Sequence, residues 1–188
     1  MRRVERAEIV DYATYEDGRE AFRARVLEAK RPRRVHLGEH LTLLFENPLT
    51  VRDQIQEMMR IERTVREADV QHEIDTYNEL LGGEGELGCT LLIEIDDAAE
   101  RAVKLRNWYG VPEHLYLRVA DGTRVRPRVD ERQRDDERIS SVHYLRFDVH
   151  GQVPVAAGCD LPALTLETPL DPAQRHALAE DLGPDAPR

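Results

Sequence analysis

Cysteine and serine are scarce in this 188-residue sequence, and their scarcity limits the chemistry that it can carry. The two cysteines, Cys89 and Cys159, lie 70 residues apart, outside any Cys-x-x-Cys motif, which excludes a zinc ribbon and a thioredoxin site. We expect Cys89 to be a core residue of a strand and Cys159 to be the candidate for an exposed thiol. The only serines are Ser140 and Ser141, in a predicted strand, so a serine hydrolase is not expected.

Long apolar runs are lacking as well. The longest have three or four residues, whereas a membrane-spanning helix needs about 20. The N-terminal residues lead into no apolar segment of the kind found in secretory signals. With 40% hydrophobic residues the chain can still bury a core, so we expect one soluble cytoplasmic domain over residues 1–188, with a frayed tail at 183–188.

Negative charge is concentrated in one part of the chain. The net charge is −10, and residues 67–100 contain eleven acids and neither lysine nor arginine, so the remaining 154 residues sum to +1. Duplex nucleic acid is not expected as a partner, because binding to phosphates needs clustered positive charge. Solvated helix faces are the simplest explanation of the acidic window, while a metal ion or a basic protein surface would also suit it.

Hydrophobic periodicity predicts helices mainly in the first half of the chain and strands mainly in the second. The predicted helices are residues 15–30, a helix capped by Thr50 that reaches about residue 65, 69–81 capped by Asp69, a short one reaching Trp108, and 171–182. The predicted strands are 35–45 with a bend at Gly38, 89–95, 114–119, 124–129, 139–149 and 164–167, with a charged loop at 130–138. This segregation indicates an α+β fold in which N-terminal helices pack on a mainly antiparallel sheet formed largely by the C-terminal half.

A glycine-rich stretch at residues 83–88 matches the spacing G-x-G-x-x-G, but it follows a predicted helix and precedes a predicted strand. A dinucleotide site needs the opposite order, and Glu84 and Glu86 would repel a pyrophosphate. We therefore expect a turn here and no nucleotide cofactor. Among the histidines, His36 and His40 could approach each other only if Gly38 makes a tight turn, and His143 fits a buried, hydrogen-bonded side chain.

Carboxylates one turn apart recur on the two central helices, where like charges at this spacing destabilise a helix slightly. The pairs are Asp53 with Glu57, Asp69 with Glu73 and Asp75 with Glu79. Neutralisation by Arg60, Arg63 and Arg66 is one explanation. The other is that Glu57, His72, Glu73 and Glu94 converge on a divalent metal ion such as iron or manganese, because oxygen-rich sets suit such ions.

Three stretches of the sequence resemble one bacterial family. They are residues 38–47 continuing into 54–60, then 73–80 with 85–87 and 90–95, and finally 137–142. The family is uncharacterised and known only as a domain of unknown function about as long as this chain, and no catalytic residue can be carried over from it. Its genes commonly lie beside those for rubrerythrin and for an iron-sulfur oxidoreductase related to heterodisulfide reductase subunits. The resemblance therefore implies a redox or peroxide-defence setting.

Two functional hypotheses follow. The first is a non-enzymatic accessory protein that docks rubrerythrin or the iron-sulfur oxidoreductase through the acidic residues Glu67, Asp69, Glu73, Asp75 and Glu79. The alternative is a metal-dependent enzyme, with non-haem iron or manganese, that uses the helix carboxylates. The catalytic residues of such an enzyme are not identified by the sequence.

Overall fold

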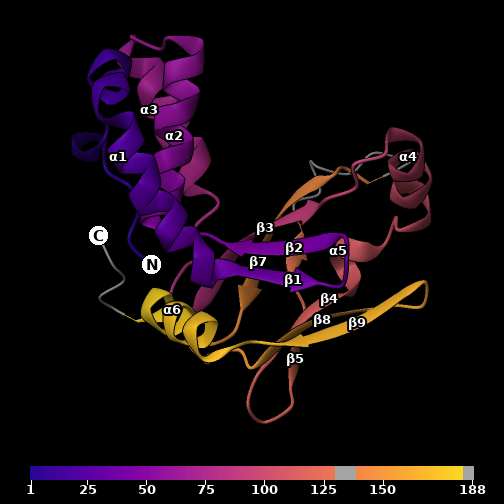
Figure 1. Cartoon of the computed structure of the whole chain (residues 1–188). Helices are drawn as coiled ribbons and strands as arrows, with labels where there is room; N and C mark the ends of the chain where they lie inside the picture. The colour runs from indigo at the N-terminus through magenta and orange to yellow at the C-terminus, as the bar shows by residue number, and fades with distance from the viewer. Residues whose placement is uncertain (130–138, 184–188) are drawn as a thin grey trace.

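Two antiparallel sheets and a group of N-terminal helices form the part of the chain that the computed structural model describes, residues 1–129 and 139–183 (Figure 1). The helices are α1 (Tyr12–Lys30), α2 (Pro48–Glu62), α3 (Glu67–Asn78), α4 (Ala98–Asn107), α5 (Val111–His114) and α6 (Pro172–Leu182). The strands are β1 (Arg34–Leu37), β2 (Leu41–Phe45), β3 (Glu86–Ile93), β4 (Leu115–Arg118), β5 (Arg124–Val125), β6 (Arg128–Val129), β7 (Val142–Asp148), β8 (Ala156–Leu161) and β9 (Leu164–Pro169). The predicted α+β class is confirmed, with the strands divided between two sheets.

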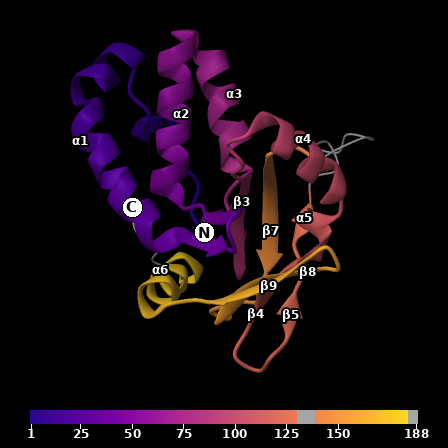
Figure 2. The same cartoon turned by 45° about the vertical axis from the view of Figure 1, so that its right-hand side comes forward.

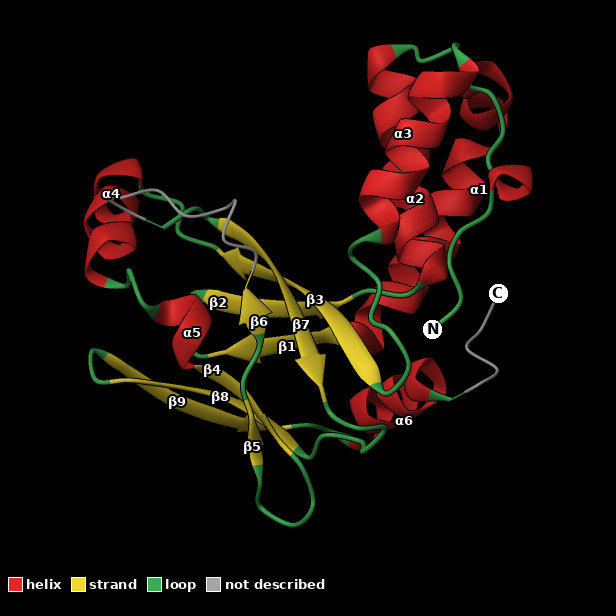
Figure 3. Ribbon diagram, turned by 180° about the vertical axis from the view of Figure 1, so that it is seen from behind, coloured by secondary structure: helices red, strands yellow, loops and turns green. Residues whose placement is uncertain are grey.

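The main core lies between the two sheets, whose strand orders are β1-β2-β3-β7-β6 and β5-β4-β8-β9. In the first sheet Phe45 of β2 is paired with Cys89 of β3, which is paired with Leu145 of β7. Alternate side chains from these strands are fully buried against β4 and β8 of the second sheet. The two sheets form separate layers (Figure 3). Each large apolar side chain buried in this way stabilises the fold by about 1.5–3 kcal/mol.

Both cysteines belong to this core. The prediction for Cys89 is confirmed, whereas Cys159 of β8 is buried and the expected exposure of its thiol is wrong. Burial raises the pKa of both thiols. Neither side chain is therefore poised to react as a thiolate.

The chain passes from one sheet to the other between β5 and β6, at Arg126 and Pro127. Proline has no N–H to donate and ends the strand, so the predicted single strand 124–129 is in fact two short strands, one in each sheet. The bend expected at Gly38 is confirmed as the turn of the β1–β2 hairpin, in which Gly38 has a φ of 62°. A Cβ there would also come within 3.0 Å of Leu166 on β9, so glycine permits both the turn and the contact between the sheets.

Helices α1, α2 and α3 lie side by side and extend away from the sheets (Figure 2). Apolar residues of α2 and α3 form a second core, which contains Val51, Ile55, Met59, Val70 and Ile74. The predicted caps of these two helices are wrong by three residues. Asn47 caps α2 by accepting from the Thr50 backbone N–H, with Pro48 as the first helical residue, and Arg66 precedes α3.

The last helix, α6, confirms the prediction for residues 171–182, and Asp171 caps it. Of the predicted frayed tail only Gly183 is described, and the predicted loop 130–138 lies outside the described residues. Within residues 1–129 and 139–183, no helix has the length and apolar character needed to span a bilayer.

Candidate functional site

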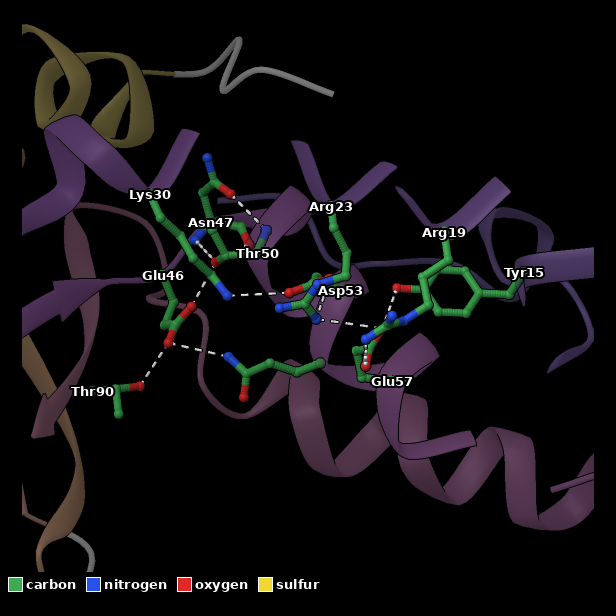
Figure 4. A network of polar contacts seen from close by, with 11 residues as sticks. Tyr15, Arg19, Arg23, Lys30, Glu46, Asn47, Thr50, Asp53, Glu57 and Thr90 are labelled. Atoms are coloured by element: carbon green, nitrogen blue, oxygen red, sulfur yellow. Dashed lines mark hydrogen bonds and ion pairs between the residues drawn. The ribbon is translucent and has the colours of Figure 1, made fainter. Parts of the chain in front are cut away.

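Glu57, one of the four predicted metal ligands, is bound by groups of α1 (Figure 4). Its Oε1 accepts from the Tyr15 hydroxyl and from Arg19 Nε, both at 2.7 Å, and its Oε2 accepts from Arg19 Nη2 at 3.0 Å. The hydrogen bond from Arg19 is the main cause that lowers the pKa of Glu57 from 4.5 to about 2. Both oxygens are thus engaged in fastening α1 to α2.

Next to Glu57, Asp53 extends the same network toward the sheet. It is buried, its Oδ2 accepts from Lys30 Nζ at 3.1 Å, and Arg23 lies 3.9 Å from its Oδ1. The like charges of Asp53 and Glu57, one helical turn apart, are therefore compensated by Arg19, Arg23 and Lys30 of α1. Arg60 also contributes, as predicted, through Nη2 at 3.3 Å from Glu57.

Glu46 is a buried carboxylate that the sequence interpretation missed. Its side chain is only 1% exposed and accepts from three uncharged donors: Thr50 Oγ1 at 2.5 Å, Gln54 Nε2 at 3.1 Å and Thr90 Oγ1 at 2.6 Å (Figure 4). It lies at the N-terminus of α2, where the helix dipole favours negative charge. The cluster joins β2, α2 and β3. Its sequence signal is the acid immediately before the cap Asn47, which is common at helix starts and does not by itself indicate a buried group.

Glu94, another predicted metal ligand, belongs to a different network at the β1–β2 hairpin. Its Oε2 accepts from Thr42 Oγ1 at 2.5 Å, and the same hydroxyl lies 2.9 Å from His36 Nδ1. Because the hydroxyl proton goes to Glu94, His36 must donate its Nδ1–H to Thr42. His40 Nδ1 faces the backbone carbonyl of Glu94 at 3.3 Å.

The remaining predicted ligands, His72 and Glu73, are on α3. Glu57 and Glu94 belong to the two separate networks described above, so the structure does not bring the four residues together. Within residues 1–129 and 139–183, no group of three or more His, Cys, Asp or Glu side chains is arranged to hold a metal ion. His143 is buried as expected, and its Nε2 lies 3.0 Å from the Ser140 carbonyl. Burial lowers the pKa of His143.

The predicted partner-binding acids all come from α3 and the residue that follows it. Glu67 is paired with Arg6 at 2.6 Å and Asp75 accepts from Gln71 Nε2 at 2.9 Å, while Asp69 and Glu79 are also exposed. Glu73 is half-buried, and burial together with the nearby Glu62 raises its pKa. In α3 these acids accompany no lysine or arginine.

A cleft of about 540 Å³ lies between α3 and the outer face of β6 and β7. Its size is within the range of about 300–1,000 Å³ that is typical of small-molecule sites. It is lined by Glu73, Thr76, Tyr77, Glu79, Leu80, Arg128, Val129, Tyr144, Leu145 and Arg146. Two predicted partner-binding acids therefore belong to the wall of a cleft. The aromatic and basic residues opposite them come from strands that the sequence does not place beside α3.

The fold and these polar networks define an α+β protein with an acidic helix beside a cleft. The chain belongs to the family described as protein of unknown function (DUF3501), whose model matches residues 3–182. A crystal structure of a novel protein of unknown function from Burkholderia pseudomallei K96243 is similar, with 33% identity, a TM-score of 0.89, and coverage of 97% of this chain and 100% of that one. No curated protein matches the chain. The predicted resemblance to a family of unknown function is confirmed.

Proposed function

We propose that this protein is a non-enzymatic accessory protein that binds a partner through the acidic surface of α3. The observation that carries the proposal is the charge of this helix, which presents Glu67, Asp69, Glu73 and Asp75, followed by Glu79, with no basic residue in the helix. Of these acids, Glu67 is paired with Arg6. A partner with a basic surface would complement this charge, increasing the rate of association and selecting against other proteins.

The partners proposed are bacterial rubrerythrin and the iron-sulfur oxidoreductase, both in the cytoplasm. The choice is supported by the resemblance to a family whose genes commonly lie beside those of these two proteins. The role would be to recruit or position a component of a peroxide-defence system. The chemistry would then remain with the metal centres of the partner.

Binding of each purified partner to the full chain at low and at physiological salt tests this proposal. We expect binding at low salt that weakens steeply with ionic strength, because exposed charges are screened beyond about 8 Å at 0.15 M salt. Asp69→Asn combined with Asp75→Asn should weaken binding about tenfold or more. The matched control, Asp17→Asn combined with Glu20→Gln, removes the same charge from α1 and should leave binding unchanged. Absence of a complex with either partner at low salt would contradict the proposal.

A further inference from the structure

We propose that the cleft between α3 and β7 binds arginine as a residue with a free carboxylate, either the free amino acid or the C-terminal residue of a peptide. The guanidinium would lie at Glu73, the carboxylate at Arg146, and the side-chain stem between Tyr77 and Tyr144. This site shares Glu73 with the proposed partner surface, and it does not depend on which protein that surface binds.

The acidic end of the cleft is formed by Glu73. Glu73 is half-buried, and within the described residues no lysine or arginine pairs with it. Burial is the main cause that raises the pKa of Glu73, repulsion from the negative charge of Glu62 raises it further, and His72 lowers it. A bound cation would relieve this repulsion. Arginine suits a carboxylate better than lysine does, because its planar guanidinium can donate two parallel hydrogen bonds.

The basic end of the cleft is formed by Arg128 and Arg146. Arg128 is ion-paired with Glu86. Arg146 instead donates its Nε, at 3.1 Å, and its Nη2 to the backbone carbonyl of Glu79, and no carboxylate among the described residues pairs with it. The carbonyl fixes the position of the guanidinium and leaves its positive charge available to an anionic group of a ligand.

The middle of the cleft has two tyrosine rings and aliphatic side chains. Tyr77 comes from α3 and Tyr144 from β7, with Leu80 and Val129 beside them. The pKa of Tyr77 is raised first by burial and then by Glu73 and Tyr144, so these three groups are neighbours. Aromatic faces attract a guanidinium and cover the methylene groups that precede it.

The two ends of the cleft lie at different positions along α3. Arg146 binds the carbonyl of Glu79, which is six residues beyond Glu73, and six residues correspond to about 9 Å along a helix. The carboxylate and guanidinium of an extended arginine can cover this distance once a hydrogen bond of about 2.9 Å is added at each end. A ligand that lacks either charged group would leave one end of the cleft unpaired.

Calorimetric titration of the full chain with defined probes tests the assignment. The probes are L-arginine and Gly-Gly-Arg, with agmatine and Gly-Gly-Arg amide as analogues that lack the carboxylate, and L-norvaline as one that lacks the guanidinium. We expect L-arginine or Gly-Gly-Arg to bind, and each analogue to bind about ten- to hundredfold more weakly, because hydrogen bonds to charged groups are lost. Binding of the free amino acid alone identifies a small-molecule site, whereas binding of the peptide alone identifies a site for a chain end.

Two variants and one control test where the ligand lies in the cleft. Glu73→Gln should weaken arginine binding about tenfold or more. Thr76→Arg places a guanidinium inside the cleft, one turn from Glu73, and should abolish binding while the protein keeps its thermal unfolding midpoint. Asp17→Asn removes an exposed carboxylate of α1 that does not line the cleft and should leave arginine binding unchanged. The assignment is overturned if neither L-arginine nor Gly-Gly-Arg binds below about 10 mM. Equal affinity for agmatine, or unchanged binding to Glu73→Gln, would overturn it as well.

Discussion

Arg33 and Asp181 form a buried bidentate ion pair between residues that are 148 positions apart in the chain. Arg33 Nε lies 2.7 Å from Asp181 Oδ2 and Nη2 lies 2.9 Å from Oδ1, and the two residues are 4% and 1% exposed. Arg33 Nη1 also donates to the carbonyl of Ala29, so the guanidinium is held on three sides. The pair fixes α6 against the end of α1.

Removal of one partner of this pair should be far more damaging than removal of both. We expect Arg33→Ala to lower the free energy of unfolding by about 3–5 kcal/mol, because Asp181 would remain as an uncompensated buried charge. Combining Arg33→Met with Asp181→Leu should recover most of that loss. Urea unfolding of the single and double variants measures both effects. Additive losses in the double variant would show that the two side chains act independently.

The Glu57 network should contribute stability that depends on pH. The pKa of Glu57 is lowered from 4.5 to about 2 in the folded protein, so its contribution is complete above about pH 4.5 and is lost as the pH falls through about 2. We expect Glu57→Gln to cost about 1–3 kcal/mol near neutral pH, with the partial exposure of Arg19 limiting the effect. The difference from the unsubstituted protein should shrink between pH 4.5 and 2. A difference that stays constant from pH 7 to pH 2.5 in urea unfolding experiments would assign the cost to packing.

Gly88 should be irreplaceable, because a Cβ there would lie 1.8 Å from the carbonyl oxygen of Leu80. The contact is with backbone and no side chain can move aside, so Gly88→Ala should cost more than about 3 kcal/mol or prevent folding. Gly18 is the matched control, since it is exposed in α1 and a Cβ there would meet nothing within 4 Å. Gly18→Ala should stabilise the protein by about 0.5–1 kcal/mol. Thermal unfolding midpoints that move equally for both variants would refute this account.

Asn78 should anchor the N-terminal segment to the second core. Its Oδ1 accepts from the Val4 N–H at 2.8 Å and its Nδ2 donates to the Val4 carbonyl at 2.9 Å, and both bonds are buried. Asn78→Ala leaves two buried backbone groups unpaired and should cost about 2–4 kcal/mol. Trypsin should then cleave faster after Arg6. Unchanged proteolysis of the N-terminal segment would argue against this anchoring role.

The elements predicted well from the sequence are those in which local pattern and tertiary environment agree. Strand β3 has an almost uninterrupted apolar stretch because most of its residues are buried, and α6 follows a capping aspartate and a proline. Strand β8 was missed because Ala156, Ala157 and Gly158 have low strand propensity. Its environment explains these small residues, since a Cβ on Gly158 would lie 2.4 Å from the ring of Tyr116.

The candidate site was predicted less completely than the fold. The acidic character of α3 is visible in the sequence, but the tyrosine and arginines that face it come from β6 and β7, and only tertiary pairing brings them to the cleft. The proposed convergence of carboxylates failed for a similar reason. The helical repeat places Glu57 on a face of α2. Arg19 and Arg23, which bind it, are on α1, whose packing angle no local pattern specifies.

The Glu46 cluster affects how the cleft would bind a ligand. Because one buried carboxylate binds side chains of α2 and β3, and α3 packs on α2, the Glu46 cluster connects the helices to the first sheet. We therefore expect the walls of the cleft to keep their arrangement when a ligand binds. Binding there requires little ordering of the protein, so the entropic cost of association falls mainly on the ligand.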